Sequence, residues 1–252
     1  MQRHLEGAHH LMAFVMRSNS SCTQPNIVFF TTEIYVYSAA LASFTTNCSP
    51  TATPIFFSQA LSNDPDLGFG VVCGCAHDLF SFIPKVSALL WDLSSNATAP
   101  ATEKSNLFAQ YHDLRSQIEY WKPRSDSLEM IHCAELYRQS ILLLLDSRFA
   151  TEPPSNIIDE AFENLELLLL RLLPSSPIAT TTNWPLFAFG IHARTPRQKE
   201  MIRSYLQCSI KVFGMGITST TLNQLEAIWR RVPKDDVIDR MFMRQGELPL
   251  IC

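Results

Sequence analysis

Apolar residues recur at helical spacing over long stretches of this chain. Between Glu103 and Trp121 they return every three or four positions and form one stripe on an otherwise polar segment. A second stretch has Asp126 as its predicted N-cap and Glu129 in the capping-box position, and its apolar residues continue to Leu145. The spacing therefore predicts two consecutive helices, each with one face in a core.

The most regular stripe begins at Ser155, directly after a pair of prolines. Its core positions are Ile158, Ala161, Phe162, Leu165, Leu168, Leu169 and Leu172. Three more helices are predicted near 184–193, 196–213 and 220–232. The middle one has the clearest ends, with Thr195 as N-cap, Pro196 at the first position, Gln198 completing the capping box and Gly214 after the last turn.

The first third of the chain is less regular. Arg3–Arg17 predicts a helix. The segment Ile27–Thr46 is rich in β-branched and aromatic residues, which favours a strand locally, yet its apolar residues step by three and four, so we predict a helix. The segment Asp66–Phe82 is apolar nearly all round and predicts a buried helix, which Pro84 breaks or kinks.

These elements predict an all-α fold, an irregular bundle of about eight to ten helices. The 15 prolines lie mostly between periodic segments, and there are only 8 glycines. Prolines between periodic segments and few glycines are typical of helices joined by loops. We expect residues 1–252 to form a single domain with flexible loops near 46–64 and 94–102.

Composition narrows the function classes. The formal net charge is −4, so the chain lacks the positive surplus of a general nucleic-acid binder. Charged residues make up only 17% of the chain, which favours either a partner or a buried face. No apolar run approaches the roughly 18 residues of a membrane span. The seven cysteines are odd in number and irregularly spaced, which argues against a disulfide framework.

Two patterns could carry metal chemistry. Cys73, Cys75 and His77 include an i, i+4 pair, but Cys75 would point away from the other two on a helix, and buried structural cysteines are the preferred interpretation. The run from Asp235 through Asp236 to Asp239 resembles the magnesium-diphosphate motif of class I terpene synthases. Only 13 residues follow it, with no second metal motif, and aspartates after a proline also suit a helix N-terminus.

A basic cluster surrounds the start of the predicted helix 196–213. It consists of Arg194, Arg197, Lys199 and Arg203. Positive charge there opposes the helix dipole. A solvated face is the preferred interpretation, and a phosphate site is the alternative.

The C-terminal third carries a family resemblance. It contains Trp184-Pro185-Leu186-Phe187 with Gly190 beyond them, and then Leu225-Glu226 with Trp229 three positions later. These two motifs are similar to the closing helices of the fungus-specific transcription factor domain. His4-Leu5-Glu6-Gly7-Ala8 resembles a step in the middle of that domain, so the chain is expected to begin mid-domain.

The resemblance implies a helical, regulatory, nuclear protein that is not an enzyme and needs no cofactor. In that family the domain follows a zinc cluster built from six closely packed cysteines, and the only close pair here is Cys73 and Cys75. We therefore expect no specific DNA binding by this chain. The expected role is to modulate transcription, for example of a secondary-metabolite pathway, through a protein partner, a second copy of the chain or a small effector.

Two alternatives stay open. One is a magnesium-dependent, terpene-synthase-like enzyme that uses Asp235, Asp236 and Asp239. The other is a non-functional, truncated regulator. Self-association is expected because a domain begun midway leaves apolar stripes uncovered, first of all in the leading segment from Leu5 to Val15 and in Ile27–Phe44.

Overall fold

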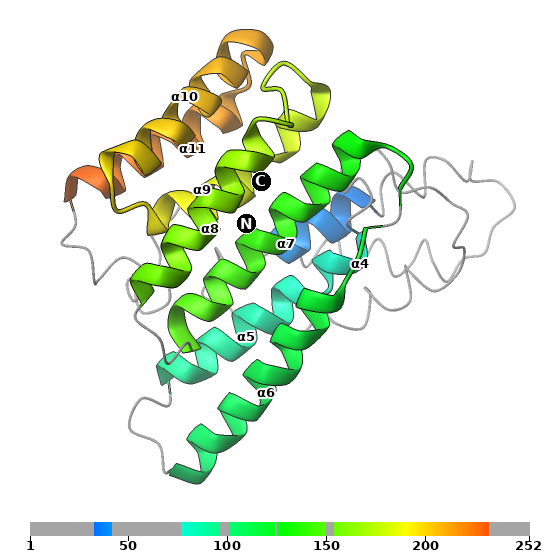
Figure 1. Ribbon diagram of the computed structural model, residues 1–252, viewed down its shortest axis with the longest axis vertical. Coiled ribbons are helices and arrows are strands. Elements are labelled where there is room, and N and C mark those ends of the chain that lie inside the picture. Colours follow the sequence, from blue (N-terminus) through cyan, green and yellow to red (C-terminus); the bar gives the residue numbers. More distant parts are fainter. Residues whose placement is uncertain (1–32, 42–76, 96–100, 124, 150–153, 232–252) are drawn as a thin grey trace, which may run out of the picture.

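A computed structural model of the chain describes residues 33–41, 77–95, 101–123, 125–149 and 154–231 (Figure 1). Within these ranges every regular element is a helix and none is a strand, which confirms the all-α prediction. Beside a helix over 33–41, the elements are α4 (His77–Phe80), α5 (Phe82–Ser95), α6 (Ala101–Tyr120), α7 (Leu128–Phe149), α8 (Pro154–Leu169), the 3-10 helix η1 (Pro177–Thr181), α9 (Asn183–His192), α10 (Pro196–Phe213) and α11 (Gly216–Arg231).

Helix α7 is the centre of the arrangement. It packs against α5 and α6 on one side and against α8 and α9 on the other, and α9 in turn contacts α10 and α11 (Figure 1). Its apolar run Ile141–Leu145 is buried throughout, so neighbours cover the helix on all sides. The described residues share one continuous hydrophobic core, which runs from Val36 to Leu225.

The stripes predicted on α6 and α8 face this core. On α6, Leu107, Tyr111, Leu114 and Ile118 are all buried. On α8 the buried residues are Ile158, Ala161, Phe162, Leu165 and Leu168. Since each helix has one apolar face, burying it fixes how the helix is rotated about its own axis.

Three local predictions need correction. The N-cap of α7 is Ser127, whose Oγ accepts from the Met130 amide at 3.4 Å, and not Asp126. The helical break before α5 falls at Ser81, and Pro84 lies in the first turn of α5, where its missing N–H has no intrahelical partner to lose. The loop expected near 94–102 overlaps helix at both ends, since α5 reaches Ser95 and α6 starts at Ala101.

The segment Ile27–Phe44 was expected to leave apolar residues uncovered, but its described residues 33–41 are mostly buried. Residues 33–41 form a helix, as predicted, in which Val36, Ala40 and Leu41 are buried, and Tyr37 packs against Phe80 with ring centroids 5.6 Å apart. Only Ile34 is a large apolar side chain exposed there, at 40%. The helix expected over 3–17, most of the one over 66–82 and the loop near 46–64 lie outside the described residues.

Candidate functional site

Helix α9 carries the first half of the family-like motif. All ten of its residues are buried, among them Trp184, Pro185 and Gly190. Pro185 lies in the first turn, where no intrahelical hydrogen bond is lost. Thr182 is the N-cap residue, and the Asn183 side-chain amide donates to the Thr180 carbonyl oxygen at 3.0 Å.

Stacking joins the motif to the central helix. The Trp184 ring lies nearly parallel to that of Tyr137 on α7, at 10° and 5.9 Å between centroids. The Tyr137 hydroxyl donates to the Thr181 carbonyl oxygen at 2.5 Å, just before α9 begins. Because Tyr137 is buried, this hydrogen bond also satisfies a polar group inside the core.

The second half of the motif, on α11, meets the first at Gly190. A Cβ built on Gly190 would lie 2.4 Å from Cδ2 of Leu225, closer than any side chain could be. Any larger residue at this position would force the Leu225 side chain to move, and glycine lets α9 and α11 pack this closely without that shift. The Trp229 indole Nε1 donates to the Gly190 carbonyl oxygen at 2.8 Å, which fastens the two helices together.

Charged residues of α10 contact Glu226 and Trp229 of α11. Arg203 Nε donates to Glu226 of α11 at 2.5 Å, and its other arm pairs with Glu200. The Arg203 guanidinium carbon lies 5.3 Å from the centre of the Trp229 ring, and Lys199 Nζ lies 5.9 Å from it. Hydrogen bonds to Glu226 and Glu200 raise the pKa of Arg203 above its ordinary value, so its charge is permanent.

An open groove of about 570 Å³ lies beside the first turns of α10. Its lining residues are Arg194, Pro196, Arg197, Lys199, Glu200 and Arg203. The helix begins as predicted, with Thr195 and Gln198 forming a reciprocal capping box and Gly214 ending the helix at φ 63°. The four basic residues noted in the sequence thus line one hollow.

Two buried ionisable groups could be taken for catalytic residues. His192 lies at the end of α9, and its Nδ1 is 2.7 Å from the Ala188 carbonyl oxygen. Burial lowers the pKa of His192 to about 4, so the ring is neutral at pH 7. A neutral histidine inside the core, with its ring hydrogen-bonded to its own helix, suits packing better than proton transfer.

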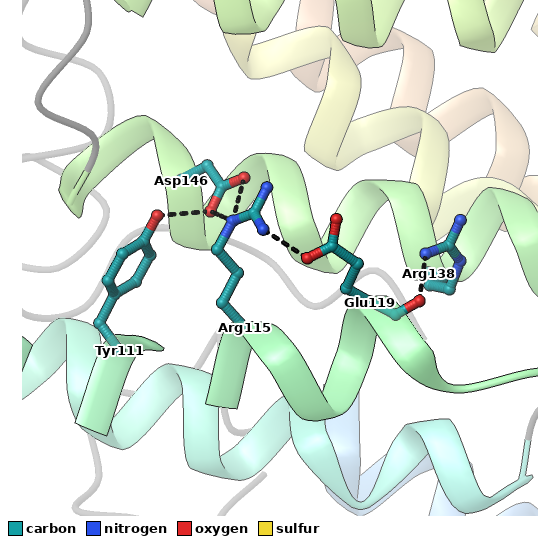
Figure 2. A network of polar contacts seen from close by, with 5 residues as sticks. All are labelled: Tyr111, Arg115, Glu119, Arg138 and Asp146. Atoms are coloured by element: carbon teal, nitrogen blue, oxygen red, sulfur yellow. Dashed lines mark hydrogen bonds and ion pairs between the residues drawn. The ribbon is translucent and has the colours of Figure 1, made fainter. Parts of the chain in front are cut away.

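The other group is Asp146, which lies in an interhelical network that sequence reasoning missed (Figure 2). It accepts from the Tyr111 hydroxyl at 3.0 Å and from Arg115 Nε at 3.0 and 3.2 Å, and Arg115 also pairs with Glu119. Arg138 joins the network by donating to the Glu119 carbonyl oxygen at 3.1 Å. The sequence signal for this network was Asp146, an acidic residue directly after the apolar run Ile141–Leu145.

The hydrogen bonds and the ion pair of this network join α6 to α7. Burial raises the pKa of Asp146, against the opposing effect of Arg115. Burial and the neighbouring Asp146 carboxylate raise the pKa of Tyr111 to about 12. Since Asp146 accepts from both partners at once, its role in the described structure is to hold the two helices in register.

The two candidate metal motifs of the sequence fall largely outside the described part of the chain. Cys73, Cys75, Asp235, Asp236 and Asp239 lie outside it. His77 opens α4, and no three His, Cys, Asp or Glu side chains gather as a metal-binding group among the described residues. No helix among those described is both long and apolar enough to cross a membrane.

Comparison with known proteins gives one result. The family model of the fungal specific transcription factor domain matches residues 1–248. No curated protein and no solved structure matches the chain. The matched residues include both halves of the motif that meets at Gly190 and the whole described bundle. The chain therefore belongs to the family of the fungal specific transcription factor domain.

Proposed function

We propose that this chain regulates transcription through contacts with other proteins and does not itself bind DNA sequence-specifically. The family match over residues 1–248 carries the proposal, because it assigns the chain to a regulatory domain. The 252 residues contain no run of closely packed cysteines that could form a zinc cluster, and their net charge of −4 disfavours phosphate contacts.

The packing of the motif supports a scaffolding role for its residues. Trp184, Gly190 and Leu225 are buried and hold α7, α9 and α11 together. A substrate has no access to such positions. Contacts with partner proteins would therefore use the surface. Three leucines within seven residues are exposed there: Leu167 at 57%, Leu170 at 75% and Leu173 at 61%. Three exposed leucines within one short segment support a contact with partner proteins there.

A reporter assay tests the regulatory role. The full chain is fused to an unrelated DNA-binding domain and expressed with a reporter that carries the matching site. We expect the reporter output to change relative to the DNA-binding domain alone. A Gly190→Leu fusion, which disrupts the α9–α11 contact, should lose the effect, and Gly216→Ala should keep it. Unchanged output with a stably expressed fusion contradicts the proposal.

DNA binding is tested directly on the unfused chain. Incubation with a randomised duplex library, followed by sequencing of the retained DNA, should enrich no motif. An enriched sequence that the chain still shifts in a gel at moderate salt, with competitor DNA present, would show that it reads DNA itself.

Nuclear localisation, control of a secondary-metabolite pathway and absence of catalysis are further parts of the proposal and rest on the family alone. A fluorescent fusion should accumulate in the nucleus. The purified chain with magnesium should not turn over prenyl diphosphates. Turnover that Asp235→Asn abolishes would favour the enzyme alternative instead.

A further inference from the structure

The groove beside α10 is positively charged within an acidic chain. Arg194, Arg197, Lys199 and Arg203 line it, although the chain as a whole has a net charge of −4. We infer that this groove binds an acidic segment of a partner protein, whose carboxylates contact Arg194, Arg197 and Lys199. The inference rests on the proposed function, because it names the kind of partner that a regulator acting through protein contacts would bind here.

The four cations differ in how firmly they are held. Arg203 is fixed, since its side chain is only 28% exposed and is paired with Glu226 and Glu200. Arg197 pairs with Glu166, but the two side chains are 76% and 43% exposed. Such surface pairs contribute little, so a partner's carboxylate can replace Glu166 at small cost. Arg203 is thus held in place by its two glutamates, whereas Arg197 can exchange Glu166 for a carboxylate of the partner.

The charges of the other two cations, Arg194 and Lys199, are available to a partner. Among the described residues, no carboxylate pairs with Arg194 or Lys199. Lys199 instead lies over the Trp229 ring. Positive side chains at this end of α10 also oppose the helix dipole, which costs stability in the free chain. A bound anion would pair with Arg194 and Lys199 and would offset their unfavourable interaction with the dipole.

The shape and charge of the groove favour a peptide over other anions. The hollow is open, so a small molecule could not be enclosed on most of its surface as small-molecule sites require. Three carboxylates lie near two of these cations: Glu166 pairs with Arg197, and Glu200 and Glu226 pair with Arg203. That mixture disfavours the dense phosphates of duplex DNA, which need a surface of one sign. A peptide can place single carboxylates at individual cations.

The test uses the full chain and a short fluorescein-labelled peptide of alternating glutamate and leucine. Fluorescence anisotropy should show saturable binding that weakens as salt rises. The same peptide with glutamine in place of glutamate should not bind. The variant R194Q/R197Q/K199Q should bind the acidic peptide about tenfold more weakly, since each exposed ion pair contributes only a few-fold. The matched variant K211Q/R230Q, altered at exposed residues outside the groove, should bind as the parent does.

Each outcome decides the question once circular dichroism has shown that both variants are folded. Equal binding by R194Q/R197Q/K199Q, or no binding by the parent chain, overturns the inference. Duplex DNA that competes the peptide off the groove would point to nucleic acid instead. If the parent chain fails to bind the acidic peptide but still changes reporter output when fused to a DNA-binding domain, the groove inference fails and the proposed function stands. If it does neither, both fail.

Discussion

The indole N–H of Trp229 donates to the carbonyl oxygen of Gly190 at 2.8 Å, across 39 positions of sequence. The same glycine admits Leu225 to a distance that no Cβ would permit. Two motif halves that are separate in the sequence therefore form one contact between α9 and α11, and its energetics can be measured residue by residue.

Gly190→Ala should lower the free energy of unfolding by about 1–3 kcal/mol, because the added methyl overlaps the buried end of Leu225. Denaturant titration measures the change. Gly216→Ala is the matched control, since no atom lies within 4 Å of its added Cβ, and it should shift stability by less than about 0.5 kcal/mol. In the double variant with Leu225→Ala the two losses should not add, because the truncated leucine removes the overlap. Additive losses would contradict the contact.

Trp229→Phe should cost about 1 kcal/mol, the net worth of one neutral hydrogen bond. The loss is limited because the Gly190 carbonyl oxygen keeps a second donor, the Ala193 amide at 3.2 Å. Trp229→Ala also removes the ring beneath Lys199 and Arg203 and should cost about 2–4 kcal/mol. Thermal and chemical unfolding of the two variants give the comparison, and equal losses would mean that the ring itself contributes nothing.

The network in Figure 2 predicts an order of effects. Arg115→Met should cost about 3 kcal/mol, because it leaves the buried Asp146 carboxylate without its cation. Asp146→Asn should cost less, about 1–2 kcal/mol, since the Arg115 side chain is 35% exposed and still reaches Glu119. Tyr111→Phe should cost about 1 kcal/mol. Urea titrations of the three variants measure this order, and a reversal of the first two would mean that Asp146 is solvated.

His192 predicts how stability depends on pH. Its pKa is lowered to about 4 in the folded chain, from an ordinary value of 6.5, because burial disfavours the charged ring. Between these values the unfolded chain binds a proton that the folded chain does not. The stability that the neutral ring supplies is therefore complete above pH 6.5 and falls by roughly 3 kcal/mol as the pH drops to about 4.

The measurement is the free energy of unfolding at several pH values across that window. His192→Gln should flatten the decline, since glutamine does not titrate. His112→Gln, at an exposed position on α6, controls for the replacement of a histidine by glutamine itself. Parallel slopes for the parent chain and His192→Gln would show that the ring is accessible to protons in the folded state.

Leu170 is 75% exposed, and Leu167 and Leu173 in the same segment are 57% and 61% exposed, so these leucines are a further surface at which the chain could self-associate. Light scattering across a concentration series should show the parent chain growing in mass, and Leu170→Glu should shift it toward monomer because a charge cannot be buried unpaired. Gln207→Glu, at an exposed site on α10, controls for added charge. A parent chain that stays monomeric at high concentration, with little binding of an apolar dye, rules the idea out.

The predictions of local structure succeeded where one short segment contained every group that its conformation needs. Helix α10 begins and ends where predicted, because Thr195, Gln198 and Gly214 satisfy its terminal backbone groups from within the segment. At α7 three neighbouring residues, Ser125, Asp126 and Ser127, could all serve as the cap. Only the path of the backbone decides between them, and it selects Ser127.

Helix α11 shows how tertiary structure extends a local prediction. Its predicted start near residue 220 was wrong, and the helix begins at Gly216. The intervening Thr/Ser-rich turn has poor intrinsic helix propensity. Thr218 and Thr221 are nevertheless buried, and the Thr221 hydroxyl donates to the Ile217 carbonyl oxygen at 3.0 Å. Packing against α9 and α10 supplies the free energy that the sequence of this turn lacks.

By itself, the sequence determined the helical class, the apolar faces of α6 and α8 and the caps of α10, because each follows from residues within a few positions of one another. The tertiary structure alone decided which faces meet. Apolar spacing shows that a helix has a buried side but does not identify the helix that covers it. The contact of Gly190 with Leu225 and Trp229, and the hydrogen bonds of Tyr111 and Arg115 to Asp146, therefore became visible only once α6, α7, α9 and α11 were packed together.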